Sequence, residues 1–222
     1  MSNRILVFAA HPDDESIGCG ASIARWTAEG HEVAVWFATD GVSSRQKQPE
    51  SAAERLVASR RALELLGVET LYAEGFPDNA MDTVSRLAVC QAMDRAVGDF
   101  HPTWVVTHSQ ADLNIDHRIV GECAAVVSRP IPGQSIKSVW HFEVPSSTGW
   151  FDSGPRRFSP NAFVDASDHW DLKVQALQAY GPEIPAWPHA RSVQAIEALA
   201  RLRGSSVGLA AAEAFEISRQ LA

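Results

Sequence analysis

Short apolar runs alternate with segments of helical periodicity along the first two thirds of the chain. Runs that are apolar at consecutive positions predict strands buried on both faces. Apolar residues spaced three and four positions apart predict amphipathic helices, and Gly30 and Gly67 are natural helix ends. We therefore expect strands at residues 5–9, 31–38, 69–73, 103–108 and 135–144, and helices at residues 16–29, 50–66, 82–100 and 116–128.

This order of elements predicts an α/β fold. Strands joined by crossover helices form parallel sheets, and the helices then cover both faces. We expect a Rossmann-like, mostly parallel sheet with helices on both faces. In such sheets ligands bind outside the carboxyl ends of the strands, so polar residues that directly follow a strand are the first candidates for a site.

The pattern weakens in the last third of the chain, after Val144. Residues 145–161 are rich in Pro, Ser, Gly, Arg and Trp, which indicates a long loop. Residues 168–179 and 192–203 have helical character, whereas residues 210–219 fit a helix or a strand. We find no repeat and no linker, and therefore expect one domain over residues 1–222 whose last third forms a cap or side wall.

Composition narrows the class of protein. The chain has 222 residues, 45% of them hydrophobic and 21% charged, with a formal net charge of -8. An acidic surface repels a nucleic acid on average, so we expect no nucleic-acid partner. The three cysteines are far apart and predict small buried residues in a reducing compartment. No segment approaches the roughly 20 apolar residues of a membrane span, and we expect a cytoplasmic protein.

Two polar motifs follow predicted strands. Residues 11–15 read His-Pro-Asp-Asp-Glu after the first strand, and residues 112–117 read Asp-Leu-Asn-Ile-Asp-His after the fourth. His11, Asp14 and His117 would together form a two-histidine, one-carboxylate set, which is a known catalytic zinc site with an open fourth position. Three consecutive acidic residues would also repel one another without a cation.

Each motif alone has a plainer interpretation. Acidic residues before a helix are typical of a helix N-terminus, where the dipole favours them, and a lone histidine after a strand is more often structural. The occurrence of both motifs at the carboxyl ends of strands favours the metal site.

A metal at Asp14 would leave the neighbouring Asp13 free. Zinc lowers the pKa of a bound water to about 7, and a carboxylate beside that water is placed to act as general base. Asp13 would take the proton during attack on an amide carbonyl and pass it to the leaving nitrogen. Glu15 is expected to cap the helix start or to hold the loop by hydrogen bonds.

The string from Ala10 to Glu15, with the Asp-His pair downstream, resembles the PIG-L/LmbE-like deacetylases. Members of that family remove N-acetyl groups from substrates that contain N-acetylglucosamine. The resemblance extends over nearly the whole chain through residues 39–41, 76–79, 144–148 and 212–215. It implies zinc bound by the two histidines and Asp14, Asp13 as the base, an amino-sugar substrate and a homo-oligomer.

The resemblance also bears on residues that face the substrate. Arg55 matches a family arginine at the substrate, the alternative being a solvated helix residue. Several members have a histidine that stabilises the oxyanion three residues before the last zinc ligand, where this chain has Asn114. Asparagine donates a hydrogen bond but carries no positive charge. Either Asn114 acts on the oxyanion, or His108 or His189 has taken the role, the alternative for each histidine being a core or surface position.

We therefore expect a hydrolase that uses Zn²⁺, or another divalent metal, to remove an N-acyl group, acetyl first, from an amino sugar. A metal- or sugar-binding protein without catalysis is the alternative from another class, but binding alone does not require the free carboxylate of Asp13. Formyl, carbamoyl and longer acyl amides stay open. Trp150, Trp170 and Trp187 would stack on a sugar or pack in the core.

Overall fold

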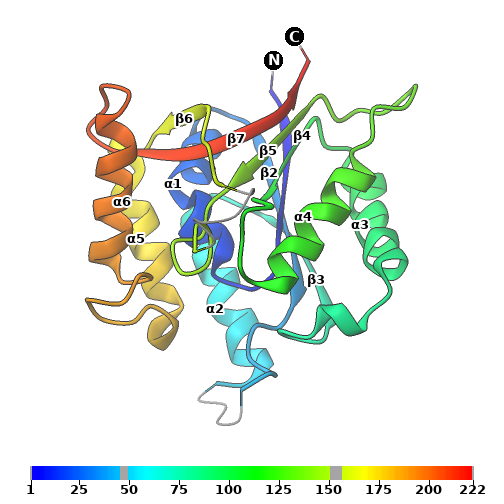
Figure 1. Cartoon of the computed structure of the whole chain (residues 1–222), viewed down its shortest axis with the longest axis horizontal. Helices are drawn as coiled ribbons and strands as arrows, with labels where there is room; N and C mark the ends of the chain where they lie inside the picture. Colours follow the sequence, from blue (N-terminus) through cyan, green and yellow to red (C-terminus); the bar gives the residue numbers. More distant parts are fainter. Residues whose placement is uncertain (1, 46–49, 151–156, 222) are drawn as a thin grey trace.

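A seven-stranded sheet forms the centre of the molecule (Figure 1). The computed structural model describes residues 2–45, 50–150 and 157–221. The strand order is β3-β2-β1-β4-β5-β7-β6, and the first five strands of the chain are mutually parallel. The strands are β1 (Arg4–Ala9), β2 (Glu32–Thr39), β3 (Thr70–Phe76), β4 (Trp104–His108), β5 (Ser138–Phe142), β6 (Ala162–Asp165) and β7 (Ala212–Gln220).

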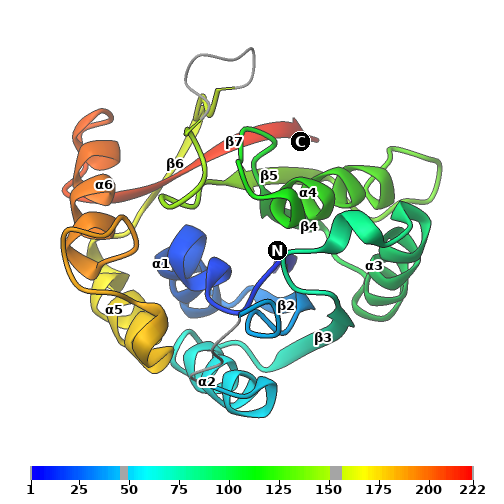
Figure 2. The ribbon, with the colours of Figure 1, turned by 60° about the horizontal axis from the view of Figure 1, so that its bottom comes forward.

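The strand order reverses between β1 and β4. The chain runs outward from β1 through β2 to β3, then returns so that β4 pairs with the other edge of β1. A crevice forms at such a reversal because the connections leave in opposite directions, and ligands bind there at the carboxyl ends of the strands. Figure 2, turned so that this edge comes forward, shows α1 between the side of α5 and α6 and the side of α4.

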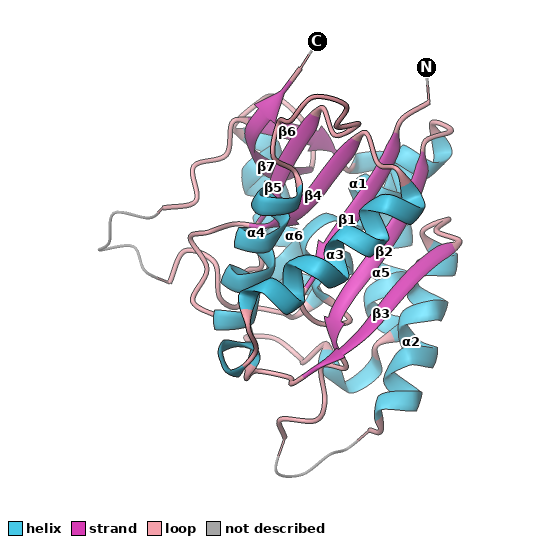
Figure 3. Ribbon diagram, turned by 90° about the vertical axis from the view of Figure 1, so that its right-hand side faces the viewer, coloured by secondary structure: helices cyan, strands magenta, loops and turns pink. Residues whose placement is uncertain are grey.

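Helices cover both faces of the sheet, which confirms the expected α/β fold (Figure 3). Alternate residues of β1 face opposite ways: Ile5 and Val7 join one hydrophobic cluster, and Leu6 and Phe8 join the other. One face carries α1 (Asp14–Ala28), α2 (Ala52–Leu65), α5 (Trp170–Ala179) and α6 (Val193–Ser205), and the other carries α3 (Arg86–Phe100) and α4 (Ile115–Val127). Within the described residues, no helix is both long and apolar enough to cross a membrane.

The structure differs from the sequence expectations in the later elements. The ambiguous residues near 210–219 form the strand β7, which pairs antiparallel with β5 and with the unexpected short strand β6. The last third of the chain therefore extends the sheet itself, and α5 and α6 form its side wall. The helix expected from residue 82 starts at Arg86, because the side chain of Ser85 accepts a hydrogen bond from Ala88 N and caps it.

Candidate active site

The loops after β1 and β4 bring the two polar motifs together. β1 and β4 are neighbours in the sheet, so the residues that follow each strand emerge side by side. His11 Nδ1 lies 3.2 Å from Asp14 Oδ2 and 3.2 Å from His117 Nε2. His117 Nε2 lies 3.3 Å from Asp14 Oδ2, so the three atoms form a nearly equilateral triangle.

This triangle fits a divalent metal ion. Bonds of about 2.0–2.1 Å to zinc in tetrahedral geometry separate neighbouring ligand atoms by about 3.3–3.4 Å. The observed separations of 3.2, 3.2 and 3.3 Å match that spacing. Asp14 Oδ1 is buried and has no hydrogen-bond partner among the described residues. Two imidazole nitrogens and one carboxylate oxygen also suit zinc and other first-row divalent metals.

The other nitrogen of each histidine faces a carboxylate. His11 Nε2 lies 3.2 Å from Asp116 Oδ2 and 3.3 Å from Asp78 Oδ1. His117 Nδ1 lies 3.1 Å from Asp112 Oδ2. Carboxylates in such positions fix the tautomer and the ring orientation, and leave the inner nitrogens free to bind a metal. Sequence analysis missed these three aspartates as supports, although each follows a strand within a polar segment.

The supporting carboxylates are themselves anchored. Asp116 accepts hydrogen bonds from the backbone N–H groups of Asn79 (2.7 Å) and Met81 (3.1 Å). Asp112 accepts from the hydroxyls of Ser147 (2.9 Å) and Thr148 (2.6 Å). Segments that follow β3, β4 and β5 therefore converge on the two histidines, which accounts for the polar character of residues 76–79 and 144–148.

Asp13 is buried and held in an unusual backbone conformation. Its φ angle is 133°, in a region that residues other than glycine rarely adopt. Its N–H donates to Glu15 Oε2 (3.1 Å), its carbonyl accepts from Ile17 N (2.9 Å), and its Oδ2 accepts from Arg191 Nη1 (3.2 Å). Oδ1 has no partner among the described residues. The side chain makes no capping hydrogen bond to α1, so the helix-cap interpretation does not account for Asp13.

Burial dominates the electrostatics of Asp13 and Glu15, the two carboxylates that flank Asp14 in the sequence. It raises the pKa of Asp13 to about 6, although the positive charge of Arg191 acts in the opposite direction. It raises the pKa of Glu15 to about 7, against hydrogen bonds from Ser16 Oγ (2.6 Å) and the Tyr180 hydroxyl (2.7 Å). Glu15 also accepts a hydrogen bond from Asp13 N, so it holds the loop after β1, as expected from the sequence.

His108 lies in the core next to the triangle of His11, Asp14 and His117. Its ring stacks on His117 with centroids 4.0 Å apart, and its Nε2 accepts a hydrogen bond from Ala10 N (2.9 Å). Burial lowers the pKa of His108 to about 3, so the ring stays neutral. The side chain is fully buried, which favours the packing role over a substrate contact.

Asn114 and Arg55 are both engaged within the protein. Asn114 is the N-cap of α4: its Oδ1 accepts from Asp116 N (2.8 Å), and its Nδ2 donates to Asn79 Oδ1 (3.0 Å). Arg55 is buried, donates to the carbonyl of Pro12 (3.1 Å), and forms ion pairs with Glu50 and Glu183 (2.9 Å each). Arg55 therefore holds the loop after β1 through its hydrogen bond to Pro12, and its burial excludes the alternative of a solvated helix residue.

An open pocket of about 410 Å³ lies next to Arg191. Trp150, which is 64% exposed, and the exposed His189 line it, so these two expected substrate contacts lie on the same rim. Trp187 is also exposed, but Trp170 packs against the core and under the ammonium of Lys173. The pocket wall is completed by Ser146, Pro182, Glu183, Pro185 and Ala190.

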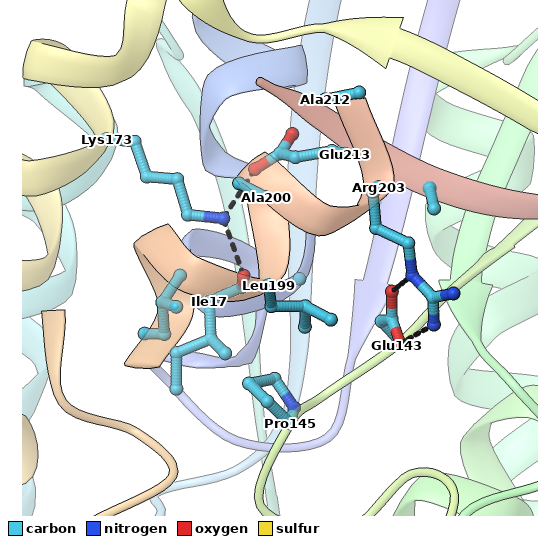
Figure 4. Close-up of a pocket in the computed structure, with 12 residues that line it drawn as sticks. Ile17, Glu143, Pro145, Lys173, Leu199, Ala200, Arg203, Ala212 and Glu213 are labelled. Atoms are coloured by element: carbon cyan, nitrogen blue, oxygen red, sulfur yellow. Dashed lines mark hydrogen bonds and ion pairs between the residues drawn. The ribbon is translucent and has the colours of Figure 1, made fainter. Parts of the chain in front are cut away.

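Helix α1 carries Asp14 and is broken in its middle. Cys19 has non-helical angles (φ -146°, ψ 24°), which splits the helix into two parts. Glu213 accepts from the N–H groups of Ala21 (3.1 Å) and Ser22 (2.6 Å), which begin the second part. Lys173 Nζ donates to the carbonyl of Ile17 (2.7 Å) in the first part and to Glu213 (2.5 Å), as Figure 4 shows. The buried pair thus fixes both ends of the break.

Close packing fixes the first part of α1 against the sheet. A Cβ atom on Gly18 would lie 2.2 Å from Cδ2 of Phe142, so only glycine fits there. Gly18 therefore allows α1 to pack closely against β5, and the first turn of α1, which carries Asp14, is held at the sheet edge.

Comparison with known proteins places this site in a family. The sequence profile of the PIG-L family, described as GlcNAc-PI de-N-acetylase, matches residues 6–128, which is more than half of the 222 residues. The chain is 29% identical over 182 residues to the uncharacterized deacetylase YaiS of Escherichia coli (strain K12), covering 79% of this chain and 89% of that protein. It is 25% identical over 202 residues to the diacetylchitobiose deacetylase of Thermococcus kodakarensis, covering 82% and 70%.

Among solved structures, the N,N'-diacetylchitobiose deacetylase from Pyrococcus horikoshii has a TM-score of 0.80 to this chain. It covers 98% of this chain and 84% of its own at 21% identity, a level that supports a shared fold. The profile match includes both motifs and more than half of the chain. The protein therefore belongs to the PIG-L family of de-N-acetylases and is an amidohydrolase, as the sequence predicts.

Proposed function

We propose that this protein removes an acetyl group from the nitrogen of an amino sugar, with Zn²⁺ bound by His11, Asp14 and His117. The observation that carries the proposal is the triangle of three buried donor atoms beside Asp13, whose Oδ1 has no partner among the described residues. The named activity of the diacetylchitobiose deacetylases supports an amino-sugar amide as the substrate.

The side chains divide the chemistry between them. A zinc ion held by the three ligands supplies Lewis acidity and lowers the pKa of water to about 7. Asp13 accepts a proton at Oδ1 from the attacking water, whose oxygen forms the new bond to the acyl carbon. Asp13 then gives that proton to the nitrogen as the C–N bond breaks, which yields a carboxylate and a free amine.

The burial of Asp13 suits this double role. A general base works best when its pKa lies near the operating pH, and burial moves the pKa of Asp13 toward that range. The carboxylate is then basic enough to take the proton and acidic enough to release it.

The rim beside Arg191 supplies the surface for the sugar. Trp150 offers an exposed aromatic face, and His189 offers an exposed ring on the same rim. His108 is fully buried and a substrate cannot contact it, whereas the exposed His189 and the half-buried Asn114 are both accessible.

An amine-release assay tests the proposal. The purified protein, supplied with zinc, is given N-acetyl, N-formyl and N-propionyl forms of the same amino sugar, alone and in a disaccharide. We expect release of the amine from the acetyl compounds, and none from the Asp13→Asn variant. Absence of amine release from every compound by zinc-loaded protein would contradict the proposed hydrolysis.

A further inference from the structure

Arg191 reaches the loop after β1 from the distant segment that precedes α6. Its Nη1 donates to Asp13 Oδ2 (3.2 Å), and its Nε donates to Ser146 Oγ (2.7 Å). The backbone on either side is fixed: Arg191 N donates to His189 Nδ1 (3.1 Å), and Ser192 caps α6. The guanidinium is therefore held at two points, Ser146 and Asp13, and Asp13 is the proposed general base.

The other arginines near this loop have different partners. Arg55 pairs with Glu50 and Glu183, and Arg45 donates to Glu183 (2.6 Å). Across the described part of the chain, Asp13 is the carboxylate that pairs with Arg191. The charge of Arg191 is thus directed at Asp13, whereas Arg55 and Arg45 are neutralised by glutamates.

The contact fixes one oxygen of Asp13 and leaves the other available. Rotation about the Cα–Cβ and Cβ–Cγ bonds would otherwise allow several orientations of the carboxylate. Glu15 and Ile17 hold only the backbone of Asp13, so Arg191 is the described residue whose contact orients its side chain. With Oδ2 held, Oδ1 keeps a single direction and has no competing partner.

We propose that Arg191, anchored by Ser146, is a positioning residue that holds the carboxylate of Asp13 in the orientation needed for proton transfer. The inference rests on the proposed function of Asp13 as general base. It links the base to the open pocket, because Arg191 and Ser146 line that pocket.

Kinetics of matched variants provide the first test. Arg191→Met is expected to lower kcat by about 10²-fold, the cost of misplacing a reacting group by about 1 Å, while KM changes much less. Arg191→Lys should recover part of kcat, and added guanidinium ion should partly rescue Arg191→Met. Arg203→Met is the control, because Arg203 has a similar exposed fraction (26% against 27%) but pairs with Glu143.

A double-variant cycle tests the anchor. Ser146→Ala should lower kcat in the parent protein by less than Arg191→Met does, and should add nothing in the Arg191→Met background. Coupled effects of this kind are expected when one residue acts through another. Full additivity of the two changes would contradict the proposed relay from Ser146 through Arg191 to Asp13.

Crystal structures of Arg191→Met and Arg203→Met give a readout that needs no activity. We expect the Asp13 carboxylate to turn or to adopt several conformers in the first variant only. An unchanged carboxylate together with a kcat equal to that of Arg203→Met would overturn the proposal. If the parent protein releases no amine from any substrate, the proposed function fails, and the two crystal structures still decide the role of Arg191.

Discussion

Asp13 and Asp14 are neighbours with opposite chemical properties. Asp14 faces the imidazole rings of His11, His108 and His117 and accepts a hydrogen bond from His11 N (2.9 Å). Burial alone would raise the pKa of Asp14, but the positive charge of His117 and hydrogen bonds from His11 and His117 outweigh it and hold that pKa well below its usual range. Burial dominates at Asp13 instead and raises its pKa to about 6. The surroundings therefore keep Asp14 ionised, which suits a metal ligand, and raise the pKa of Asp13, which suits the proposed proton acceptor.

This difference predicts that replacing Asp13 lowers turnover alone, whereas replacing Asp14 lowers both turnover and zinc affinity. Asp13→Asn keeps the shape of the side chain but cannot accept a proton, so kcat should fall by at least about 10²–10⁴-fold with zinc still bound. Asp14→Asn should lower zinc affinity as well. Turnover on the acetylated substrate and zinc content by elemental analysis check both. Near-normal turnover of Asp13→Asn with full zinc content would assign the base to another residue.

Variants at position 114 can distinguish a capping role of Asn114 from a role in stabilising the oxyanion. Its Oδ1 caps α4 and its Nδ2 is bound to Asn79, so we expect Asn114→Ala to cost about 1 kcal/mol of unfolding free energy. Asn114→Ser should keep the cap, because serine is as good an N-cap as asparagine. We expect kcat of both variants to stay within about tenfold of the parent. A loss of about 10²–10³-fold in Asn114→Ser, with stability retained, would instead show that the amide acts on the oxyanion.

The elements that position the site depend on contacts distant in sequence. The first part of α1 presents Asp14 from one end, and the pair of Lys173 and Glu213 holds its other end at the Cys19 break. Those two residues come from α5 and β7, so the last third of the chain fixes the orientation of the first motif. Glu213 lies within residues 212–215, one of the segments that resemble the family.

The ion pair of Lys173 and Glu213 should not be replaceable by an apolar pair. Breaking a buried pair from one side costs about 3–5 kcal/mol, and a joint apolar replacement is often neutral. Here Glu213 also accepts from Ala21 N and Ser22 N, which would lose their acceptor. We therefore expect Lys173→Met with Glu213→Leu to remain strongly destabilised in denaturant unfolding. The exposed pair of Arg201 and Glu197 is the control: Arg201→Met should cost less than about 1 kcal/mol.

Recovery of parental stability in the double variant would contradict this explanation of the α1 break. It would show that packing of the methionine and leucine side chains compensates for the two unpaired N–H groups. A loss confined to Glu213→Leu would instead assign the stabilisation to the helix cap alone and not to the ion pair.

The sequence predicts most elements because their burial is uniform. β1 and β2 are apolar at most positions and β4 and β5 are almost wholly buried, since helices cover both faces of the sheet, whereas the edge strand β3 is only partly buried. β7 was ambiguous because its buried half reads Ala-Glu-Ala-Phe, where the buried Glu213 interrupts the apolar run. β6 has four half-buried residues and exists through its pairing with β7, which no local pattern contains.

Some site residues can likewise be recognised from a local sequence motif, whereas others depend on contacts between distant segments. His11, Asp13 and Asp14 lie in one motif and His117 in another, and each follows a strand, so the sequence places them at one edge of the sheet. Arg191 is 178 residues from Asp13 and lies in an irregular segment, so nothing in the local pattern joins the two. Asp78 and Asp112 were within recognisable segments, but their direction toward the histidines depends on the folded loops.

On the scale of the whole molecule, the three proposed metal ligands come from two halves of the sheet. His11 and Asp14 follow β1, from which the chain builds β2 and β3, and His117 follows β4, from which it builds β5. A metal held by all three side chains, as proposed, would bind the folded protein more tightly than the unfolded chain. Its binding free energy therefore adds to the stability of the fold.

Zinc should raise the melting temperature, and a chelator should lower it. At a free zinc concentration 100-fold above Kd the gain is about 2.7 kcal/mol, or about 5–11 °C for a chain of this size. Asp14→Asn and His117→Ala should lose this response, whereas Asp13→Asn should keep it because Asp13 is not a proposed ligand. The exposed Asp94 is the control, and Asp94→Asn should respond like the parent. Calorimetry with and without zinc measures all five proteins, and an equal zinc shift in Asp14→Asn and the parent would mean that the metal binds elsewhere.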